Sequence, residues 1–407
     1  MRRFCKHIDI TDYSTIRPFV EDCIFRHYKR HDFKKFLFEH GLKRKYYYFK
    51  LLKCHDKSCL RSTINTITRH VVRILNNENL DELTPVSIRT KEDASCGKTR
   101  EIGCEGPLQQ ILDFIAVGGA KELFDKRIVK QQCASIPKRG QKYGVKMIQK
   151  YVRKDNRQIS YKKKHGYFYT QKMKYFVKLD IQKCFPSMRL EVFMRFFRKD
   201  CANRKLCWLW ENLLKSHKVD NDHQGFMIGS LVSQWAAQYL ISFVYRFAMN
   251  IRSKRRSKNF VSHTVIFMDD ILLTGGCRND LLSAVKLLRK YVYNNLKLNT
   301  KPNFNIRSFE NSVGIDMMGF VVYRNGKISI RAKTFIKMRR LYLRYKKQNL
   351  NLSVRQSRRH TSYKGFYKLS NTKQLDKEYK IIYSFNRAAF VVSRNDKQIN
   401  QAERSAA

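Results

Sequence analysis

Two neighbouring aspartates are the residues of this sequence whose types and spacing most directly suggest chemistry. Asp269 and Asp270 lie between two short apolar runs, and a Gly-Gly pair ends the stretch 263–276. Apolar runs rich in β-branched and aromatic residues predict a buried β-hairpin with the aspartates at its turn. Adjacent carboxylates at such a turn repel each other, so a cation would stabilise them. For an isolated Asp-Asp pair, the alternative is a solvated turn between surface strands.

Asp180 is the third candidate carboxylate. It ends the predicted strand 175–180, and a carboxylate at the end of a buried strand is a natural ligand for a divalent ion. A glycine-containing turn that opens a helix lies between Asp180 and the Asp-Asp pair, and basic segments surround both. This order suits a two-metal nucleotidyl transferase, in which two divalent ions about 4 Å apart hold the attacking and leaving oxygens. Carboxylate ligands favour Mg²⁺.

The charge of the chain indicates a long polyanionic partner. The 407 residues include 84 Lys and Arg against 33 Asp and Glu, a formal net charge of +51. Binding a nucleic acid with such a surface is favourable because neutralised phosphates release counterions. The 22 Tyr and 27 Phe are mixed through the basic stretches, which suits phosphate contact combined with base stacking. The alternative is a crowded basic surface without a specific partner.

The cysteines and the N-terminus predict a cytoplasmic protein without a membrane segment. The 11 cysteines include no CxxC pair, and their groupings do not give four ligands at zinc spacing. Reduced thiols in a cytosolic protein are therefore expected. The N-terminus lacks an apolar signal core, and no apolar run approaches the roughly 20 residues that span a bilayer.

Several basic elements could position a phosphate-bearing substrate. Residues 86–104 predict strand, turn and strand, from which Arg89, Lys98 and Arg100 would project towards a triphosphate. The glycine-containing basic loop 133–144 opens the next helix, where the backbone could approach phosphates closely. Residues 148–175 predict an exposed loop or ribbon with a nucleic-acid face. The predicted nucleic-acid contacts are Lys138, Arg139, Lys162, Lys163, Lys337, Arg340 and Arg344.

The remaining pattern is mostly helical. Helices are predicted in much of 1–82, at 108–123, in segments up to about 217, at 281–296, and from Lys333 with an apolar stripe at Phe335, Met338, Tyr342 and Tyr345. Gly229 would allow an unusual backbone angle and the close approach of a ligand. Ser233 and Gln234 follow in the first turn of a long helix. Lys301 would open a short strand, 313–323 would form a hairpin with glycine at both ends of its turn, and the polar tail after about 393 would be disordered.

These motifs together resemble those of bacterial reverse transcriptases, from about Pro85 to Leu369. The quoted matches are the [FY]xDD motif at 267–270, Asp180 with Phe185 as D-x-x-x-x-[FY], the basic segment 97–100, the hairpin 314–320 and the helix from Lys333. The resemblance implies an α+β right-hand polymerase, with fingers, a palm with an antiparallel sheet, and a helical thumb. The implied division is a basic helical extension at 1–82, fingers at 83–179, a palm at 180–325 with a helical segment at 189–217, a thumb at 326–393 and a disordered tail at 394–407.

The resemblance also implies the role of each site residue in copying an RNA template into cDNA. The catalytic residues would be Asp180, Asp269 and Asp270, which with Ile181 would hold two Mg²⁺ ions, or Mn²⁺ instead. Phe185 would act as a steric gate that excludes a ribose 2′-hydroxyl. The dNTP-binding residues would be Arg89, Lys98, Arg100, Phe185, Ser233, Gln234 and Lys301. The primer-binding residues would be Gly314, Met317, Met318 and Gly319.

Departures from the family pattern reduce the possible subclasses to two. Phe267 replaces the more usual Tyr, and Ser233-Gln234 stands where most of these enzymes have Ser-Pro, a form similar to diversity-generating retroelement enzymes. The sequence marks of retron enzymes are absent. Phage-defence reverse transcriptases, which use a dedicated non-coding RNA, share the same core, so both subclasses stay open. A different class, an RNA-binding scaffold derived from a polymerase, would be favoured by lost carboxylates, but all three are present. The sequence does not indicate protein partners.

Overall fold

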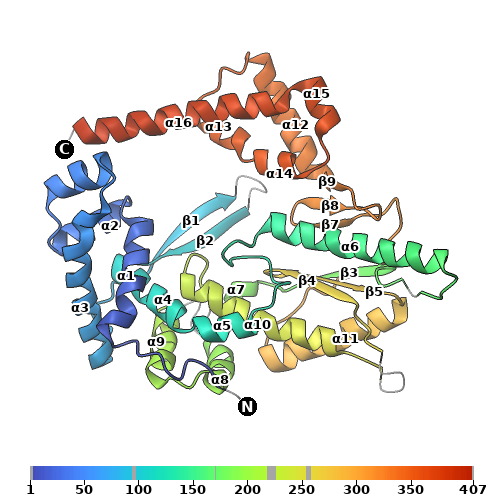
Figure 1. Cartoon of the computed structure of the whole chain (residues 1–407), viewed down its shortest axis with the longest axis horizontal. Helices are drawn as coiled ribbons and strands as arrows, with labels where there is room; N and C mark the ends of the chain where they lie inside the picture. The colour runs from blue at the N-terminus through green and yellow to red at the C-terminus, as the bar shows by residue number, and fades with distance from the viewer. Residues whose placement is uncertain (1–2, 94–97, 170, 218–225, 254–257, 406–407) are drawn as a thin grey trace. The chain divides into compact units, whose positions relative to one another are not determined.

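The computed structural model describes residues 3–93, 98–169, 171–217, 226–253 and 258–405 (Figure 1). The chain forms two compact units, each built from several segments. Unit 1 comprises Met1–Lys130, Ile181–Phe247 and Leu288–Thr300, and unit 2 comprises Gln131–Asp180, Ala248–Leu287 and Lys301–Ala407. The fold is mixed α+β, as predicted, and all pairs of named strands are antiparallel. The division into fingers, palm and thumb stays a prediction.

Unit 1 is mainly helical. Its elements are α1 (Tyr13–His27), α2 (His31–Glu39), the π-helix η1 (Tyr46–Lys53), the 3-10 helix η2 (Lys57–Leu60), α3 (Arg61–Asn77), β1 (Ser87–Asp93), β2 (Lys98–Cys104), α4 (Pro107–Gly119), α5 (Lys121–Arg127), α7 (Cys184–Ser187), α8 (Leu190–Asp200), α9 (Arg204–Lys215), most of α10 (Leu231–Asn250) and the end of α11 (Arg278–Leu296). The helices predicted before residue 82 and between 189 and 217 are therefore confirmed.

Apolar spacing explains why these helices form. In α3, Ile64, Ile67, Val71 and Leu75 recur every three or four residues and are all buried, which is the pattern of a helix that packs by one face. Aromatic residues fill the centre of the unit, where the Trp210 ring contacts neighbouring phenylalanine rings. The Trp210 indole N–H donates to the carbonyl of Ala116 at 3.0 Å, so its polar group is satisfied inside the core.

Unit 2 contains the larger sheets and the C-terminal helices. Its elements are α6 (Gln141–Lys164), β3 (Tyr175–Asp180), β4 (His263–Phe267), β5 (Asp270–Gly275), the start of α11, β6 (Arg307–Ser308), β7 (Ile315–Met317), β8 (Phe320–Val322), β9 (Ile328–Ile330), α12 (Ala332–Lys347), α13 (Val354–Thr361), α14 (Lys364–Leu369), α15 (Lys373–Tyr379) and α16 (Ile381–Ser405). One sheet has the strand order β4-β5-β3-β6, and another has the order β7-β8-β9.

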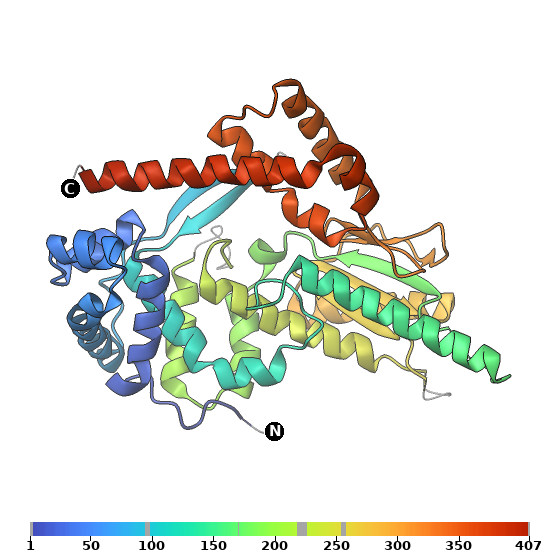
Figure 2. The same cartoon turned by 45° about the horizontal axis from the view of Figure 1, so that its top comes forward.

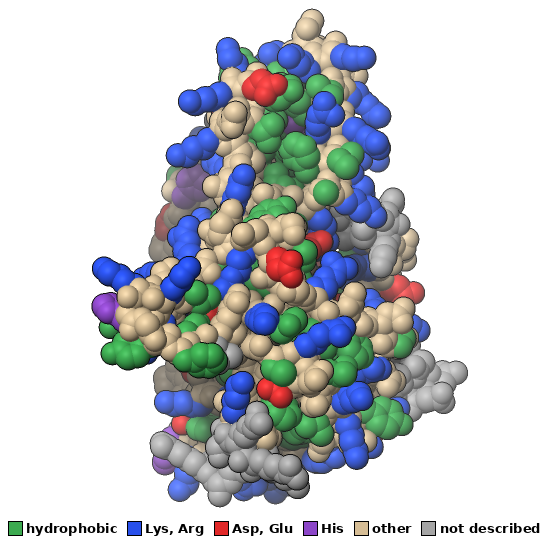
Figure 3. Space-filling model, turned by 90° about the vertical axis from the view of Figure 1, so that its right-hand side faces the viewer, with side chains coloured by type: hydrophobic (Ala, Val, Ile, Leu, Met, Phe, Trp, Pro, Cys, Tyr) green, Lys and Arg blue, Asp and Glu red, His purple; other side chains and the backbone are tan. Residues whose placement is uncertain are grey.

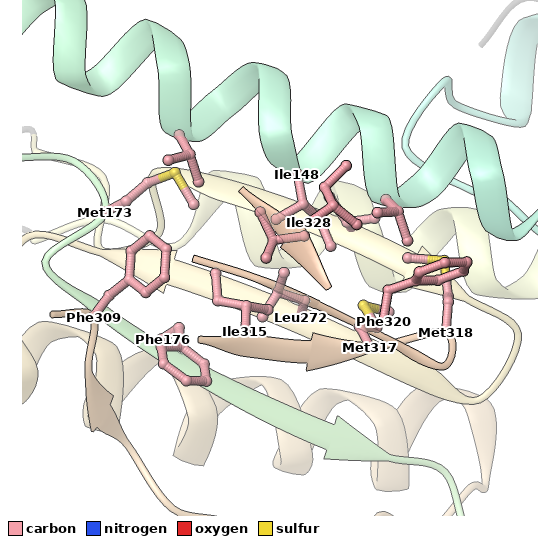
Figure 4. Close-up of a cluster of buried hydrophobic side chains, with 14 of the residues drawn as sticks. Ile148, Met173, Phe176, Leu272, Phe309, Ile315, Met317, Met318, Phe320 and Ile328 are labelled. Carbon is pink, nitrogen blue, oxygen red and sulfur yellow. The ribbon is translucent and has the colours of Figure 1, made fainter. Parts of the chain in front are cut away.

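A shared core joins α6 to both sheets of unit 2. Figure 4 shows Ile148 of α6 above Phe176 of β3, Leu272 of β5 and Ile328 of β9, all of them buried. Burying such side chains fully stabilises the fold by roughly 1.5–3 kcal/mol each. This core fixes β3, which ends at Asp180, and β5, which begins at Asp270, so it supports the candidate site.

Four predictions for unit 2 are wrong in detail. Residues up to Lys164 belong to α6 rather than to an exposed loop or ribbon, because Val145, Ile148 and Val152 give this basic segment one buried face. The strand expected at Lys301 begins only at Arg307. Gly314 precedes β7, so only Gly319 lies in the β7–β8 turn. The tail continues as α16 to Ser405, since extending a helix that has already formed requires no new nucleus.

The C-terminal helices form a second core. Met338, Tyr342 and Tyr345 of α12 are buried with Phe385 of α16, and Phe335 is packed at the edge, so the predicted apolar stripe of α12 is confirmed. The α16 Ser384 hydroxyl and the α13 His360 Nε2 are hydrogen-bonded at 2.8 Å. Among the described residues, no helix combines the length and the apolar composition needed to cross a bilayer.

Candidate active site

The strand register of unit 2 brings two carboxylates together. In the antiparallel ladder of β3 and β5, Asp180 lies directly opposite Asp270, and side chains in such pairs have Cβ atoms about 4.5–5.5 Å apart. Asp269 lies in the tight turn between β4 and β5, next to Met268, whose φ of 53° is left-handed. That conformation at the first central residue is typical of two-residue hairpin turns. The predicted buried hairpin with the Asp-Asp pair at its turn is therefore confirmed.

The electrostatics of this group are those of crowded anions. Burial raises the pKa of the Asp270 carboxyl, and the charges of Asp269 and Asp180 raise it further, while Lys178 and Arg331 act in the opposite direction. A raised carboxyl pKa means that the ionised form is disfavoured by its surroundings. A cation bound between the carboxylates would relieve that penalty.

Lys301 occupies one side of Asp180. Its backbone N–H donates to the Asp180 carbonyl and its Nζ donates to Asp180 Oδ2, both at 2.8 Å. The hydrogen bond to Asp180 raises the pKa of Lys301. Asp180 Oδ1 is buried and has no hydrogen-bond partner among the described residues. Lys301, predicted to bind dNTP, is therefore paired with a predicted metal ligand.

The donor set fits Mg²⁺ in its chemistry, although its side chains are not gathered as a finished metal site. Within the described ranges, no three His, Cys, Asp or Glu side chains are arranged to hold an ion. Carboxylate oxygens are the ligands that Mg²⁺ prefers, and Asp180 Oδ1 is an unsatisfied one. Ile181, also predicted as a ligand, is buried and bridged to Thr300, so it could offer only its main-chain oxygen. An ion could therefore bind Oδ1 while Lys301 stays on Oδ2, whereas binding through both carboxylate oxygens would require Lys301 to release Oδ2.

A polar pocket opens beside these carboxylates on the same face of β3. Side chains alternate along a strand, so Phe176 and Lys178 share the face of Asp180. Phe176 and Lys178 line a cavity of about 410 Å³ together with Asn303, Phe304, Asn305, Arg307, Gly314 and Asp316. Lys178 was not among the predicted site residues, although its position two residues before Asp180 in a predicted strand was the signal that could have identified it.

Two of the four predicted primer-binding residues are core residues. Met317 and Met318 are buried against α6, so their side chains cannot contact a primer as they lie here. Met318 and Gly319 both have positive φ and form the β7–β8 turn. A Cβ at Gly319 would lie 2.5 Å from the Phe366 ring. Gly314 lines the polar pocket, so the backbone at Gly314 and in the turn is what this segment can offer to a primer.

The predicted basic hairpin of unit 1 is confirmed. In the ladder of β1 and β2, Arg89 pairs with Ile102 and Lys91 pairs with Arg100. Because these positions alternate along the strands, Arg89, Lys91 and Arg100 share one face, and all three are exposed. Position 97 of the predicted motif lies outside the described residues. Lys98 begins β2 at the backbone level, and its side chain is likewise outside them.

Gly229 has the unusual backbone that was predicted, for a different reason. Its φ is +116°, and a Cβ there would lie 2.5 Å from the carbonyl oxygen of Gly103 in β2. The Gly103 N–H donates to the carbonyl of Ile228 at 2.8 Å. The close approach in this structure is to the backbone of the basic hairpin, which Gly229 anchors. Gly229 also lines a cavity together with Arg89 and Gln234, so the approach of a ligand stays a prediction.

Ser233 is a structural residue rather than an accessible dNTP contact, so that prediction is corrected. It is fully buried, and its Oγ accepts the Met227 N–H at 3.1 Å and lies 3.2 Å from His217 Nδ1. The other nitrogen of His217 lies 3.0 Å from the Glu105 carboxylate. The sequence could not reveal this network because its members come from three separate segments.

Gln234 and Arg89, two of the predicted dNTP contacts, line one cavity of unit 1. Its volume is about 580 Å³, and Arg26 and Arg30 of α1 also line it. Phe185, the predicted steric gate, lies in the short helix α7 and is only partly buried. Its carbonyl accepts the N–H of Phe226 at 3.3 Å. A partly exposed ring is compatible with a contact to substrate, whereas a core phenylalanine would be fully buried.

The predicted nucleic-acid contacts lie on exposed or partly exposed positions. Lys138 and Arg139 are in the loop before α6, and Lys162 and Lys163 are in its last turn. Lys337, Arg340 and Arg344 are exposed along one stripe of α12. Many Lys and Arg side chains and few Asp and Glu side chains lie on the face shown in Figure 3. The Lys162 ammonium lies over the Tyr167 ring, 4.5 Å from its centroid.

Comparisons with known proteins give no sequence match and a distant structural likeness. No protein-family model and no curated protein matches the sequence. Among solved structures, the chain is similar to telomerase from Candida albicans in complex with the TWJ fragment of telomeric RNA, with a TM-score of 0.39 and 12% sequence identity. The match covers 77% of this chain and 61% of that chain, so this chain spans about three fifths of its length. A likeness at this level does not identify a family.

Proposed function

We propose that this chain is an RNA-directed DNA polymerase of the right-hand type that copies a bound RNA template into cDNA. The observation that carries the proposal is the placement of Asp180 directly opposite Asp270, with Asp269 in the adjoining turn. The three carboxylates at this end of the sheet disfavour one another's ionised form unless cations are bound among them. Nucleotidyl transfer through two divalent ions is the chemistry that such a group serves.

Each residue of the carboxylate group has a role in this proposal. Asp180, Asp269 and Asp270, with the main chain of Ile181, would hold two Mg²⁺ ions or Mn²⁺, which when bound supply Lewis acidity and charge neutralisation. Lys301 would leave Asp180 and place its ammonium beside the substrate phosphates. Lys178 and Arg307 in the adjoining pocket would bind the sugar-phosphate backbone of the primer strand.

The basic hairpin would bind the triphosphate. The exposed guanidinium groups of Arg89 and Arg100 can each make two parallel hydrogen bonds to phosphate oxygens, and Lys98 would add a further positive charge. The backbone contact between Gly229 and Gly103 would hold this hairpin in position, which pre-organises its charges. The surrounding basic surface would bind the RNA template and the cDNA product.

Primer extension on an RNA template tests the proposal directly. The purified chain should incorporate dNTPs in Mg²⁺ and should stop when the ion is chelated. Asp269→Asn and Asp180→Asn should each abolish synthesis while RNA binding stays close to the parental level, since one charge changes little on a surface of net charge +51. Extension by either variant at the parental rate would refute the two-metal assignment.

Phe185 allows a separate test of sugar selection. A ring beneath the incoming sugar would leave no space for a 2′-hydroxyl, so Phe185→Ala should accept rNTPs while it keeps most dNTP incorporation. The melting temperature of the same sample shows whether the variant is folded. A folded and active variant that still rejects rNTPs would eliminate Phe185 as the gate.

A second candidate function is an RNA-binding scaffold that does not polymerise. The ion pair of Lys301 with Asp180 favours it, because this contact already neutralises one carboxylate. Lys301→Ala separates the two candidates. In a polymerase it should lower but not abolish extension, whereas in a scaffold neither the parental chain nor the variant would extend a primer in Mg²⁺ or Mn²⁺.

The biological setting that we propose is a cytoplasmic bacterial retroelement or an antiphage defence system with a dedicated non-coding RNA. The core motifs suit both settings, and the Ser-Gln pair at 233–234 is similar to the form in diversity-generating retroelement enzymes. Sequencing the nucleic acid that copurifies with the chain would distinguish them. A single structured RNA without a variable target gene nearby would indicate defence, and a repeat pair beside a variable gene would indicate a retroelement.

A further inference from the structure

Helix α16 runs from the predicted thumb into the segment expected to be a polar tail, and it carries an exposed stripe that the proposed function does not explain. Tyr383 and Phe390 of α16 are 60% and 67% exposed, and Arg387 and Arg394 are exposed between and after them. The spacing of four, three and four residues keeps all four side chains on one narrow stripe of the helix. The packed side of α16, with Ile381, Ser384, Phe385 and Ala388, faces the other way.

We propose that this stripe, Tyr383, Arg387, Phe390 and Arg394, binds an unpaired segment of RNA outside the polymerase site. Aromatic rings stack on unpaired bases of any sequence, and arginines between them contact phosphates. The two rings lie two helical turns apart, about 10.5 Å along the axis, so each would meet a different base of one strand. The inference extends the RNA partner of the proposed function to a site that takes no part in catalysis.

The surroundings of the stripe favour an anionic partner. The Lys364 Nζ donates to Asn386 Oδ1 at 3.0 Å, which places another cation at the edge of the stripe. Asp396 is the one acidic residue among the described side chains of α16, and Arg358 pairs with it at 2.8 Å. No unpaired carboxylate of the described part of α16 therefore opposes a phosphate. Figures 1 and 2 both show the C-terminal part of α16 extending beyond α12–α15, so these helices leave it uncovered.

Other occupants fit the stripe less well. If two copies paired through it, Arg387 and Arg394 would lie at the seam of the coiled coil, where like charges repel each other. A membrane surface requires a broad apolar face with charges on the opposite side, whereas here charged and aromatic residues alternate within one stripe. A single exposed aromatic residue needs no special explanation. Two aromatic residues that share one helical stripe with two arginines do need one.

The test measures how the full chain binds two RNA hairpins, one with an unpaired loop and one almost fully paired. The double variant Tyr383→Ala/Phe390→Ala should weaken binding of the looped RNA by tenfold or more and change binding of the paired RNA much less. Arg387→Ala/Arg394→Ala should reduce the salt dependence of binding by about 0.7 in log-log slope for each lost contact. Phe390→Trp should retain binding, because it keeps a stacking ring.

The matched control is Tyr293→Ala, which removes an equally exposed ring, 59%, from another helix and should leave binding unchanged. Melting curves establish that each variant is folded, and primer extension should persist in the double variant.

If the folded double variant bound the looped RNA with parental affinity, the inference would be overturned and the proposed function would stand. Loss of self-association or of binding to anionic phospholipid vesicles, with RNA affinity unchanged, would assign the stripe to another partner. A parental chain that binds no RNA would refute both proposals.

Discussion

The two hairpins that carry the candidate chemistry are built in opposite ways. The β4–β5 hairpin of unit 2 is buried along its strands and concentrates negative charge at its turn. The β1–β2 hairpin of unit 1 is exposed along most of its length and spreads positive charge over one face. Carboxylates that must hold ions need rigid support because small displacements change the geometry of the reacting atoms. Positive charges that bind a mobile phosphate chain can act from an exposed ribbon that is anchored at one point.

The comparison predicts that one substitution will have very different effects in the two hairpins. Ile271 of β5 is 0% exposed and Ile88 of β1 is 59% exposed. Ile271→Ala should lower the free energy of unfolding by about 2–5 kcal/mol because it leaves a cavity, and Ile88→Ala should change it by less than about 0.5 kcal/mol. Denaturant unfolding of the two variants measures both values. Similar losses would show that the exposed hairpin is packed more tightly than its exposure indicates.

Acid should destabilise the buried hairpin through His263, the first residue of β4. Burial lowers the pKa of His263 to about 4, and its ring stacks on Tyr151 at 4.1 Å. Because the unfolded chain binds the proton more readily, the contribution of His263 to stability is complete above pH 6.5 and is lost as the pH falls towards 4. His263→Phe, which keeps the stacked ring, should flatten the pH dependence of the unfolding free energy over this range. An unchanged slope would exclude His263 as its source.

The anchor of the exposed hairpin should be sensitive at Gly229. A Cβ there would meet the Gly103 carbonyl in a backbone conformation that side chains rarely adopt. Gly229→Ala should therefore cost roughly 1–3 kcal/mol and expose β1 and β2 to limited proteolysis. Gly365→Ala is the control, because a Cβ at this helical position meets nothing within 4 Å and should be neutral or stabilising by about 1 kcal/mol. Equal effects of the two substitutions would contradict the anchor.

Elements could be predicted from the sequence where the local residue pattern agrees with the burial seen in the structure. The apolar runs around Asp269 and Asp270 identified a buried hairpin because no other element suits short β-branched runs that end at glycines. The basic hairpin was predicted from two short strand-like runs on either side of a polar loop. The pairing of Asp180 with Asp270 could not be predicted from local pattern, since register depends on contacts between distant segments.

The wrong predictions also depend on contacts between segments that are distant in the sequence. Ser233 was expected to face a substrate because it opens a helix after a glycine turn, but His217 from a separate segment encloses it. The basic residues before Lys164 concealed the few apolar positions that make α6 a packed helix. Polar composition after residue 393 suggested disorder, although the helix had already begun on the packed residues Ile381 and Phe385. In each case a tertiary contact decided what composition left undetermined.

The smallest effect on stability is expected on the basic face of the exposed hairpin, where only function should change. Arg89 and Arg100 share this face, whereas Thr90 and Thr99 lie on the other. Arg89→Ala/Arg100→Ala should alter the unfolding free energy by less than about 0.5 kcal/mol. The same variant should raise the KM for dNTP by about tenfold or more, because each hydrogen bond to a charged group contributes roughly 1.5–3 kcal/mol.

The control Thr90→Ala/Thr99→Ala should leave both the unfolding free energy and the KM unchanged. Arg100→Lys should recover only part of the loss, since an ammonium keeps the charge but cannot make paired hydrogen bonds. A parental KM in the double arginine variant would show that the triphosphate is bound elsewhere, and an equal rise in the threonine control would show that the hairpin acts through its backbone.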